Sequence, residues 1–169
     1  MNKIVIGIIG TTVIILVGLV VLGSQGTPSS QPEVGESIAL QPADHIPVGQ
    51  AHPAYSSSPP TSGWHYADPA PWGVVSQPVA DENAIHNLEH GGIWISYNPQ
   101  KVDPTTINQL SSLVRGYPSK VLLSSPPTDD QAIAVASWGR LMKLDRLDQG
   151  QITQFIQRNK NKGPEQVPD

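Results

Sequence analysis

The stretch IHNLEHGGIWISYNP, residues 85–99, predicts how the centre of the fold is built. Within it, Gly92 to Tyr97 has the composition of a β-strand, and Ile93 and Ile95 lie on the same face of that strand. A segment with two histidines and a glycine pair leads directly into the strand. The stretch therefore predicts a strand with an apolar face, joined to a polar segment that offers side chains for chemistry.

The conformation of the polar segment decides whether His86 and His90 can act together. On a helical turn, residues four apart lie on one face with their Cβ atoms about 6 Å apart. On a strand the same two residues are separated by about 13 Å. The run Asp81 to Asn83 can cap a short helix, and Gly91 can adopt the left-handed conformation that ends one. We therefore predict a helical turn in which both imidazoles are close enough to share one metal ion.

Beyond the strand, the pattern predicts two amphipathic helices. The first begins at Asp103, an N-cap residue followed by proline, and ends at Gly116. Its apolar stripe consists of Ile107, Leu110, Leu113 and Val114. The second helix is capped by Asp148, carries Ile152, Phe155 and Ile156, and ends before Gly163 and Pro164.

Three further strands are predicted at residues 120–124, 132–137 and 140–144. This order of elements is typical of an α+β fold, in which helices lie on one side of a small mixed sheet. The preceding residues 38–78 are rich in proline and show no sustained period of 2 or 3.6, which predicts ordered loops wrapped on a core. We therefore predict one α+β domain, residues 37–169, with a loop-rich first half.

The N-terminal residues predict a membrane anchor. Residues 4–22 contain no charged side chain and, at 1.5 Å per residue, cross about 28 Å of hydrocarbon as a transmembrane helix. The alternative is a cleavable signal peptide, whose apolar core is usually only about 7 to 15 residues long. Lys3 predicts a cytoplasmic start, residues 1–3, with everything after the helix outside the cell membrane. Residues 23–36, rich in Gly, Ser, Pro and Gln, are predicted to be a flexible linker.

Composition excludes several kinds of site. The chain contains no cysteine, which removes disulfides, thiolate metal sites and a cysteine nucleophile. Its formal net charge is −4, with acidic and basic residues interspersed, which argues against nucleic acid as a partner. Ser62 lacks the G-x-S-x-G elbow of a serine nucleophile. The remaining metal ligands are imidazole and carboxylate, which suit zinc, Cu(II) or nickel.

All five histidines lie in the loop-rich first half of the predicted domain. The candidate metal ligands are His45, His65, His86 and His90, with Glu89 completing the coordination shell or fixing an imidazole tautomer. Residues 86–90 also match the pattern H-x-x-E-H, in which Glu89 would activate water in a zinc-dependent hydrolase. In the structural alternative, the histidines satisfy buried backbone groups, and Glu89 accepts backbone N–H groups or pairs with Arg140.

Four strings in this order, AYSSSPPTSGWHY, APWGVVSQPV, IHNLEHGGIWISYNP and ASWGRLMKLD, resemble the membrane-anchored bacterial family catalogued as domain of unknown function 3105. The resemblance runs from about His45 to Pro164 and implies a one-pass anchor followed by an extracytoplasmic α+β domain. The family has histidines at the four candidate positions, whereas His52 is peculiar to this chain. Trp64 stands where the family usually has proline. The resemblance implies no established activity.

The leading hypothesis is a membrane-anchored extracytoplasmic protein that binds a divalent transition metal, copper or zinc, through this histidine cluster. A first alternative is a non-catalytic accessory domain of a membrane or envelope complex, in which the histidines are structural. The zinc-dependent hydrolase is a second alternative.

Overall fold

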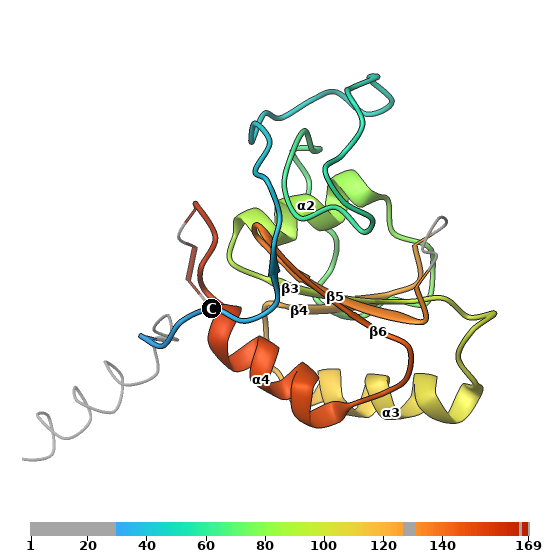
Figure 1. Ribbon diagram of the computed structural model, residues 1–169. Coiled ribbons are helices and arrows are strands. Elements are labelled where there is room, and N and C mark those ends of the chain that lie inside the picture. Colours follow the sequence, from blue (N-terminus) through green and yellow to red (C-terminus); the bar gives the residue numbers. More distant parts are fainter. Residues whose placement is uncertain (1–29, 127–130, 166, 169) are drawn as a thin grey trace, which may run out of the picture.

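The computed structural model describes residues 30–126, 131–165 and 167–168. The anchor predicted for residues 4–22 lies outside this part of the chain, and within the described part no helix has the length and apolar character needed to cross a membrane. The described residues form a mixed six-stranded sheet, three helices and long loops (Figure 1). The predicted α+β class is therefore confirmed.

The sheet has the strand order β1-β6-β5-β3-β4-β2. Its strands are β1 (Glu36–Ser37), β2 (Gly73–Val74), β3 (Ile93–Tyr97), β4 (Val121–Ser124), β5 (Ile133–Ser137) and β6 (Arg140–Leu144). β4 pairs in parallel with β3 and β2, whereas β5, β6 and β1 are added in antiparallel pairs. All four predicted strands are present. The prediction omitted β1 and β2 because two residues are too few to show a period.

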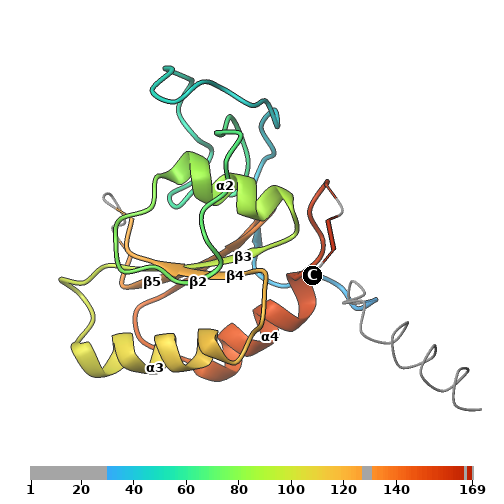
Figure 2. The same cartoon turned by 180° about the vertical axis from the view of Figure 1, so that it is seen from behind.

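Helices cover both faces of the sheet, as Figures 1 and 2 show from opposite sides. The helices α3 (Pro104–Arg115) and α4 (Gln149–Asn159) lie on one face, and α2 (Asp81–Glu89) lies on the other, beneath the loops of residues 38–78. This corrects the predicted arrangement, which had helices on one side only.

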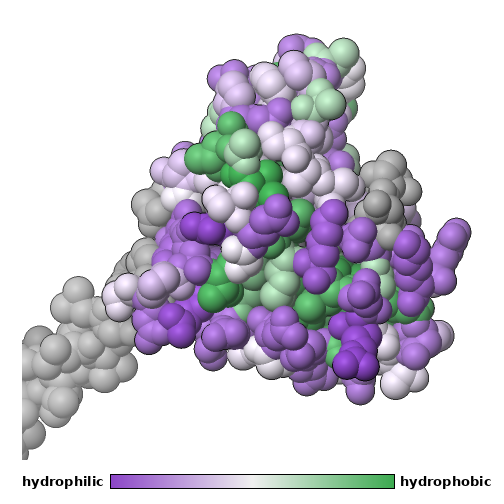
Figure 3. Space-filling view, in the orientation of Figure 1, coloured by the Kyte–Doolittle hydropathy of each residue, from purple (hydrophilic) through white to green (hydrophobic). Residues whose placement is uncertain are grey.

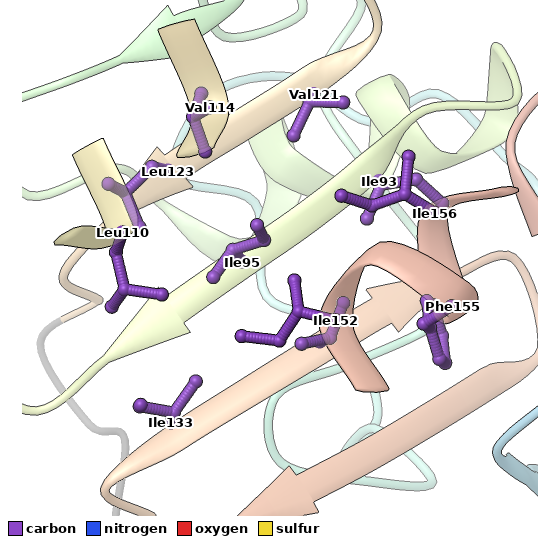
Figure 4. Packing of buried hydrophobic residues seen from close by; sticks show 11 residues of the cluster. Ile93, Ile95, Leu110, Val114, Val121, Leu123, Ile133, Ile152, Phe155 and Ile156 are labelled. Carbon is purple, nitrogen blue, oxygen red and sulfur yellow. The ribbon is translucent and has the colours of Figure 1, made fainter. Parts of the chain in front are cut away.

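Alternation along the central strand explains why both faces need a cover. Ile93 and Ile95 of β3 point into the core that also contains Leu110 of α3 and Phe155 of α4 (Figure 4). Trp94, between them in sequence, is fully buried on the opposite face. Side chains of successive strand residues point to opposite faces, so a strand that is apolar at every position is stable only between two layers.

The helix starts on the α3 and α4 side follow the predicted capping. The side chain of Asp103 accepts a hydrogen bond from Thr106 N at 2.7 Å, and that of Asp148 accepts one from Gln151 N at 2.9 Å. α2 differs, because its N-cap residue Ala80 provides no side-chain cap. The acidic residues predicted to cap α2 instead lie inside its first turn, where negative charge is favourable.

The last part of the predicted linker is docked on the domain. Val34 N donates to Asn159 Oδ1 at 3.0 Å, and Asn159 Nδ2 donates back to Val34 O at 2.8 Å. Arg140 Nε donates to Glu33 Oε2 at 2.9 Å. Polar composition alone predicted flexibility for these residues, but a small number of specific partners holds them in place.

Candidate metal centre

The site begins at the C-terminal end of α2. His86 lies in the last turn, and His90 is the C-cap residue, whose N–H donates to His86 O at 3.1 Å. Gly91 ends the helix with φ of 78°. The predicted helical turn is therefore present, and the two imidazole centroids are 4.4 Å apart.

Two extended segments of the loop region bring two more imidazoles to the same place. His45 and His65 form an isolated parallel bridge, in which Ile46 N donates to His65 O at 2.8 Å and His65 N donates to Asp44 O at 3.1 Å. The His45 ring stacks on the His86 ring with centroids 5.1 Å apart, and the His65 ring lies edge-on to it at 5.2 Å. Residues that are far apart in the sequence thus converge on the end of one helix.

Four residues offer donor atoms within 4.8 Å of one another: His45, His65, His86 and Glu89. We call them the inner group. Glu89 Oε2 lies 2.9 Å from His65 Nε2 and 3.7 Å from His45 Nε2. Two ligands of a tetrahedral zinc ion are about 3.3 Å apart when the metal–nitrogen bonds have their usual length. The two donor–donor distances at Glu89 therefore lie within about half an ångström of the distance between two zinc ligands, a difference that small side-chain movements can close.

Hydrogen bonds to backbone carbonyls orient the two buried rings. His65 Nδ1 lies 2.8 Å from Gly63 O, and His86 Nδ1 lies 2.7 Å from Tyr66 O. A carbonyl oxygen only accepts, so each Nδ1 carries the proton, and in the neutral ring Nε2 keeps the lone pair. Metal-bound histidines are commonly held in this way, with the ring nitrogen that does not bind the metal donating to a carbonyl.

The contact between His65 and Glu89 needs a positive charge or a proton. His65 Nε2 and Glu89 Oε2 are 2.9 Å apart, and the His65 side chain is fully buried. Because Nδ1 already donates to Gly63 O, a neutral ring and an ionised carboxylate would set two acceptors against each other. Either a proton or a metal ion resolves this conflict. The inner group could therefore hold a metal ion in place of that proton.

The C-terminal segment adds an acidic side chain to the site. Glu165 N donates to Glu89 O at 3.1 Å, and Glu165 Oε2 lies 2.9 Å from His90 Nε2. His90 Nε2 also lies 3.0 Å from His86 Nε2. His86, Glu89, His90 and Glu165, which we call the outer group, again offer donor atoms within 4.8 Å of one another. The sequence does not single out Glu165, because its position at the site depends on the return of the chain after α4.

One family of known sequences matches this chain. The family described as "Protein of unknown function (DUF3105)" matches residues 48–169, most of the chain and nearly all of the described domain. The chain belongs to this family. No curated protein and no solved structure matches it.

Two other residues named in the sequence analysis of this DUF3105 protein, His52 and Arg140, lie outside the two groups. His52 contacts Pro53 O and Glu82 through its ring nitrogens and stacks on Trp64. Arg140, a predicted partner of Glu89, pairs with Glu33 instead. Glu89 belongs to both groups and faces the histidines, a position that suits a metal ligand, an orienting carboxylate or a general base.

The backbone just before His65 is held in place by Tyr55 and Gly63. Tyr55 Oη donates to Trp64 O at 2.8 Å, and Gly63, at φ of 128°, sets the turn that precedes it. A Cβ atom on Gly63 would lie 2.9 Å from the Tyr55 ring. The tyrosine therefore holds the backbone that proline would otherwise stiffen.

The electrostatic environment keeps His86 available as a ligand. Burial lowers the pKa of His86 below its ordinary value, and the neighbouring His90, His65 and His45 lower it further against the opposing effect of Tyr66 O. The ring is therefore neutral at pH 7, as metal binding requires. The site also lies at the C-terminal end of α2, where the helix dipole favours cations.

The lowered pKa of His86 predicts acid sensitivity of the metal-free chain. The folded state binds fewer protons than the unfolded state below pH about 6.5, so the stability present above that pH is lost as the pH falls through the pKa of the folded state. We expect the melting temperature, measured with a chelator present, to fall between pH 7 and pH 5. His86→Asn should flatten this dependence, whereas an equally steep dependence in the variant would contradict the assignment.

Proposed function

We propose that this protein is a membrane-anchored extracytoplasmic protein that binds one divalent transition metal ion, copper or zinc, through the inner group. One observation carries the proposal: three imidazoles and a carboxylate converge within 4.8 Å at the end of α2. His65 and His86 are buried, and a backbone carbonyl orients each ring through its Nδ1. Such preorganisation lowers the entropic cost of assembling a coordination shell.

The donor set supports copper or zinc over other ions. Imidazole nitrogen suits zinc, copper, iron and nickel, whereas magnesium and calcium prefer oxygen ligands. The chain has no cysteine to provide the thiolates that favour Cu(I). A site of three imidazoles and one carboxylate fits Zn(II) and Cu(II) in both charge and number of ligands.

Anchorage and location are proposed from the sequence alone. The uncharged run of residues 4–22 has the length of a membrane span, and Lys3 ahead of it favours a cytoplasmic N-terminus. A metal site on the outer side of the membrane would meet ions before they enter the cell.

A titration tests the proposal. The full-length chain, purified without a histidine tag and treated with chelator, is titrated with Zn(II) and with Cu(II) while its thermal unfolding is recorded. An ion at 100 times its dissociation constant stabilises the folded state by about 2.7 kcal/mol, so the melting temperature should rise by several degrees. No rise with either ion at concentrations well above micromolar would overturn the proposal.

The absence of any rise in melting temperature would favour the alternative of a non-catalytic accessory domain that binds a protein partner. Large apolar side chains are exposed at Leu40, Val48 and Val74. On the face shown in Figure 3, hydrophobic patches are interrupted by hydrophilic side chains. Scattered apolar residues are ordinary on protein surfaces and do not by themselves indicate a partner. The histidine cluster is therefore the more specific feature.

A further inference from the structure

The inner and outer groups share two residues, His86 and Glu89. His86 has a single lone pair to offer, on Nε2, because Nδ1 donates to Tyr66 O. One lone pair binds one metal ion, so His86 cannot serve both groups at once. An ion that binds His86 as part of one group therefore deprives the other group of this ligand.

The two positions differ in how they are built. The inner group contains the fully buried His65, whereas the outer group contains Glu165, whose side chain is 55% exposed. The inner group has three imidazoles and one carboxylate, and the outer group has two of each. Two carboxylates attract a hydrated cation more strongly, and three imidazoles bind Zn(II) or Cu(II) more firmly once water is lost.

The fold holds Glu165 at this place through its backbone. The chain after α4 passes directly over the end of α2: Asn161 N donates to Gly91 O at 2.7 Å, and Glu165 N donates to Glu89 O. Gly163 lies so close that a Cβ atom would be 2.0 Å from Glu89 O. The buried Lys120 donates to Asn161 Oδ1 at 2.8 Å. We call residues 161–165 the C-terminal strap.

We propose that His90 and Glu165 form an entry position, through which the metal ion reaches and leaves the inner group by exchange at His86 and Glu89. This inference rests on the proposed function, because it needs the inner group to bind a metal. As the ion moves inward, its bonds to His90 and Glu165 break and bonds to His45 and His65 form. The ion keeps its oxidation state. The proton between His65 and Glu89 goes to water, and His90 recovers a proton.

The experiment compares rates with equilibrium affinity. Stopped-flow mixing of the full-length metal-free chain with Zn(II) gives the loading rate, and mixing the loaded chain with a chromogenic chelator gives the release rate. We expect Glu165→Gln and His90→Ala to slow both rates about tenfold, the lower range for electrostatic steering, while the dissociation constant changes little. These substitutions destabilise the ion at the entry position. They therefore slow loading and release by the same factor, because the free energies of the metal-free chain and of the loaded inner group are unchanged.

A matched control is present in the chain. Glu82 Oε1 lies 3.4 Å from His52 Nε2, and neither residue belongs to the inner or outer group. Glu82→Gln therefore removes a negative charge from a similar histidine–glutamate pair. Its rates should equal those of the wild type. The substitution at Glu165 keeps the backbone hydrogen bond to Glu89 O, so the C-terminal strap stays in place.

Two outcomes would overturn the entry position while leaving the proposed function intact. Unchanged rates in both variants would mean that the ion enters past His45, whose side chain is 52% exposed. A dissociation constant as weak as that of His65→Ala would make Glu165 and His90 ordinary ligands of a single position. A wild-type chain that binds no metal would overturn the proposed function as well, so the two failures are distinguishable.

Discussion

His65→Ala is expected to abolish metal binding. His65 provides one of the four donor atoms, and its ring is fixed between Gly63 O and Glu89 Oε2. Partners that only orient a metal ligand are worth 10–100-fold in affinity, so loss of a ligand should weaken binding by more than about 100-fold. Isothermal titration with Zn(II) and Cu(II) measures the effect. Binding within tenfold of the wild-type affinity would remove His65 from the ligand set.

The same substitution also tests the structure around the ring. Because His65 is fully buried, alanine leaves a cavity and deprives the Glu89 carboxylate of its partner. We expect a loss of about 3 kcal/mol in the free energy of unfolding, the range seen when one member of a buried pair is removed. This loss can obscure the loss of metal, so less disruptive variants are needed.

His45 and His52 provide those variants. The His45 side chain is about half exposed, so His45→Ala should leave the fold intact and weaken metal binding. The His52 ring contacts a backbone carbonyl and a glutamate, as the His65 ring does, but His52 lies outside both groups. His52→Ala should bind metal with the wild-type affinity. Equal effects of the two substitutions would show that histidine content, rather than the inner group, determines binding.

Gly163→Ala is expected to destabilise the whole domain. A Cβ atom at this position would lie 2.0 Å from Glu89 O and 2.3 Å from Gly91 N, both backbone atoms that cannot move without distorting the end of α2. Overpacking of this kind costs about 1–3 kcal/mol, and often more where backbone is involved. Chemical denaturation measures the change in the free energy of unfolding.

Gly150→Ala is the matched control. Gly150 lies in the first turn of α4, where an added Cβ would meet the capping carboxylate of Asp148 at 3.3 Å and no backbone atom. Alanine is favoured over glycine in helices by about 1 kcal/mol, which offsets a small shift of this carboxylate, so we expect stability within about 1 kcal/mol of the wild type. If Gly163→Ala were as stable as the wild type, the C-terminal strap would not be packed against α2.

Much of the second half of the fold is predictable from local signals. The side chains of Asp103 and Asp148 act as caps where the sequence predicts helix starts, and the four longer strands follow their apolar patterns. Strand order and the side of the sheet that each helix covers depend on packing between distant segments. Trp94 illustrates this dependence: its position on the second face requires a cover, but no local pattern identifies α2 as that cover.

Some residues of the candidate site can also be predicted from local sequence signals, whereas others depend on the tertiary structure. His86 and His90 form a recognisable pair because their spacing matches a helical turn. His45 and His65 were candidates by residue type and family resemblance, and their convergence depends on a bridge between two loops. Glu165 carries no local signal, because only the tertiary path of the C-terminal strap brings it to His90.

The most direct test of the central claim is the metal content of the protein itself. Elemental analysis of the full-length chain, purified without a histidine tag and desalted after incubation with Zn(II) or Cu(II), counts the ions bound per chain. We expect close to one ion per chain in the wild type and in His52→Ala, and almost none in His65→Ala. A wild-type chain that retains no metal would contradict the central claim, leaving the histidines at the end of α2 as a hydrogen-bonded structural cluster.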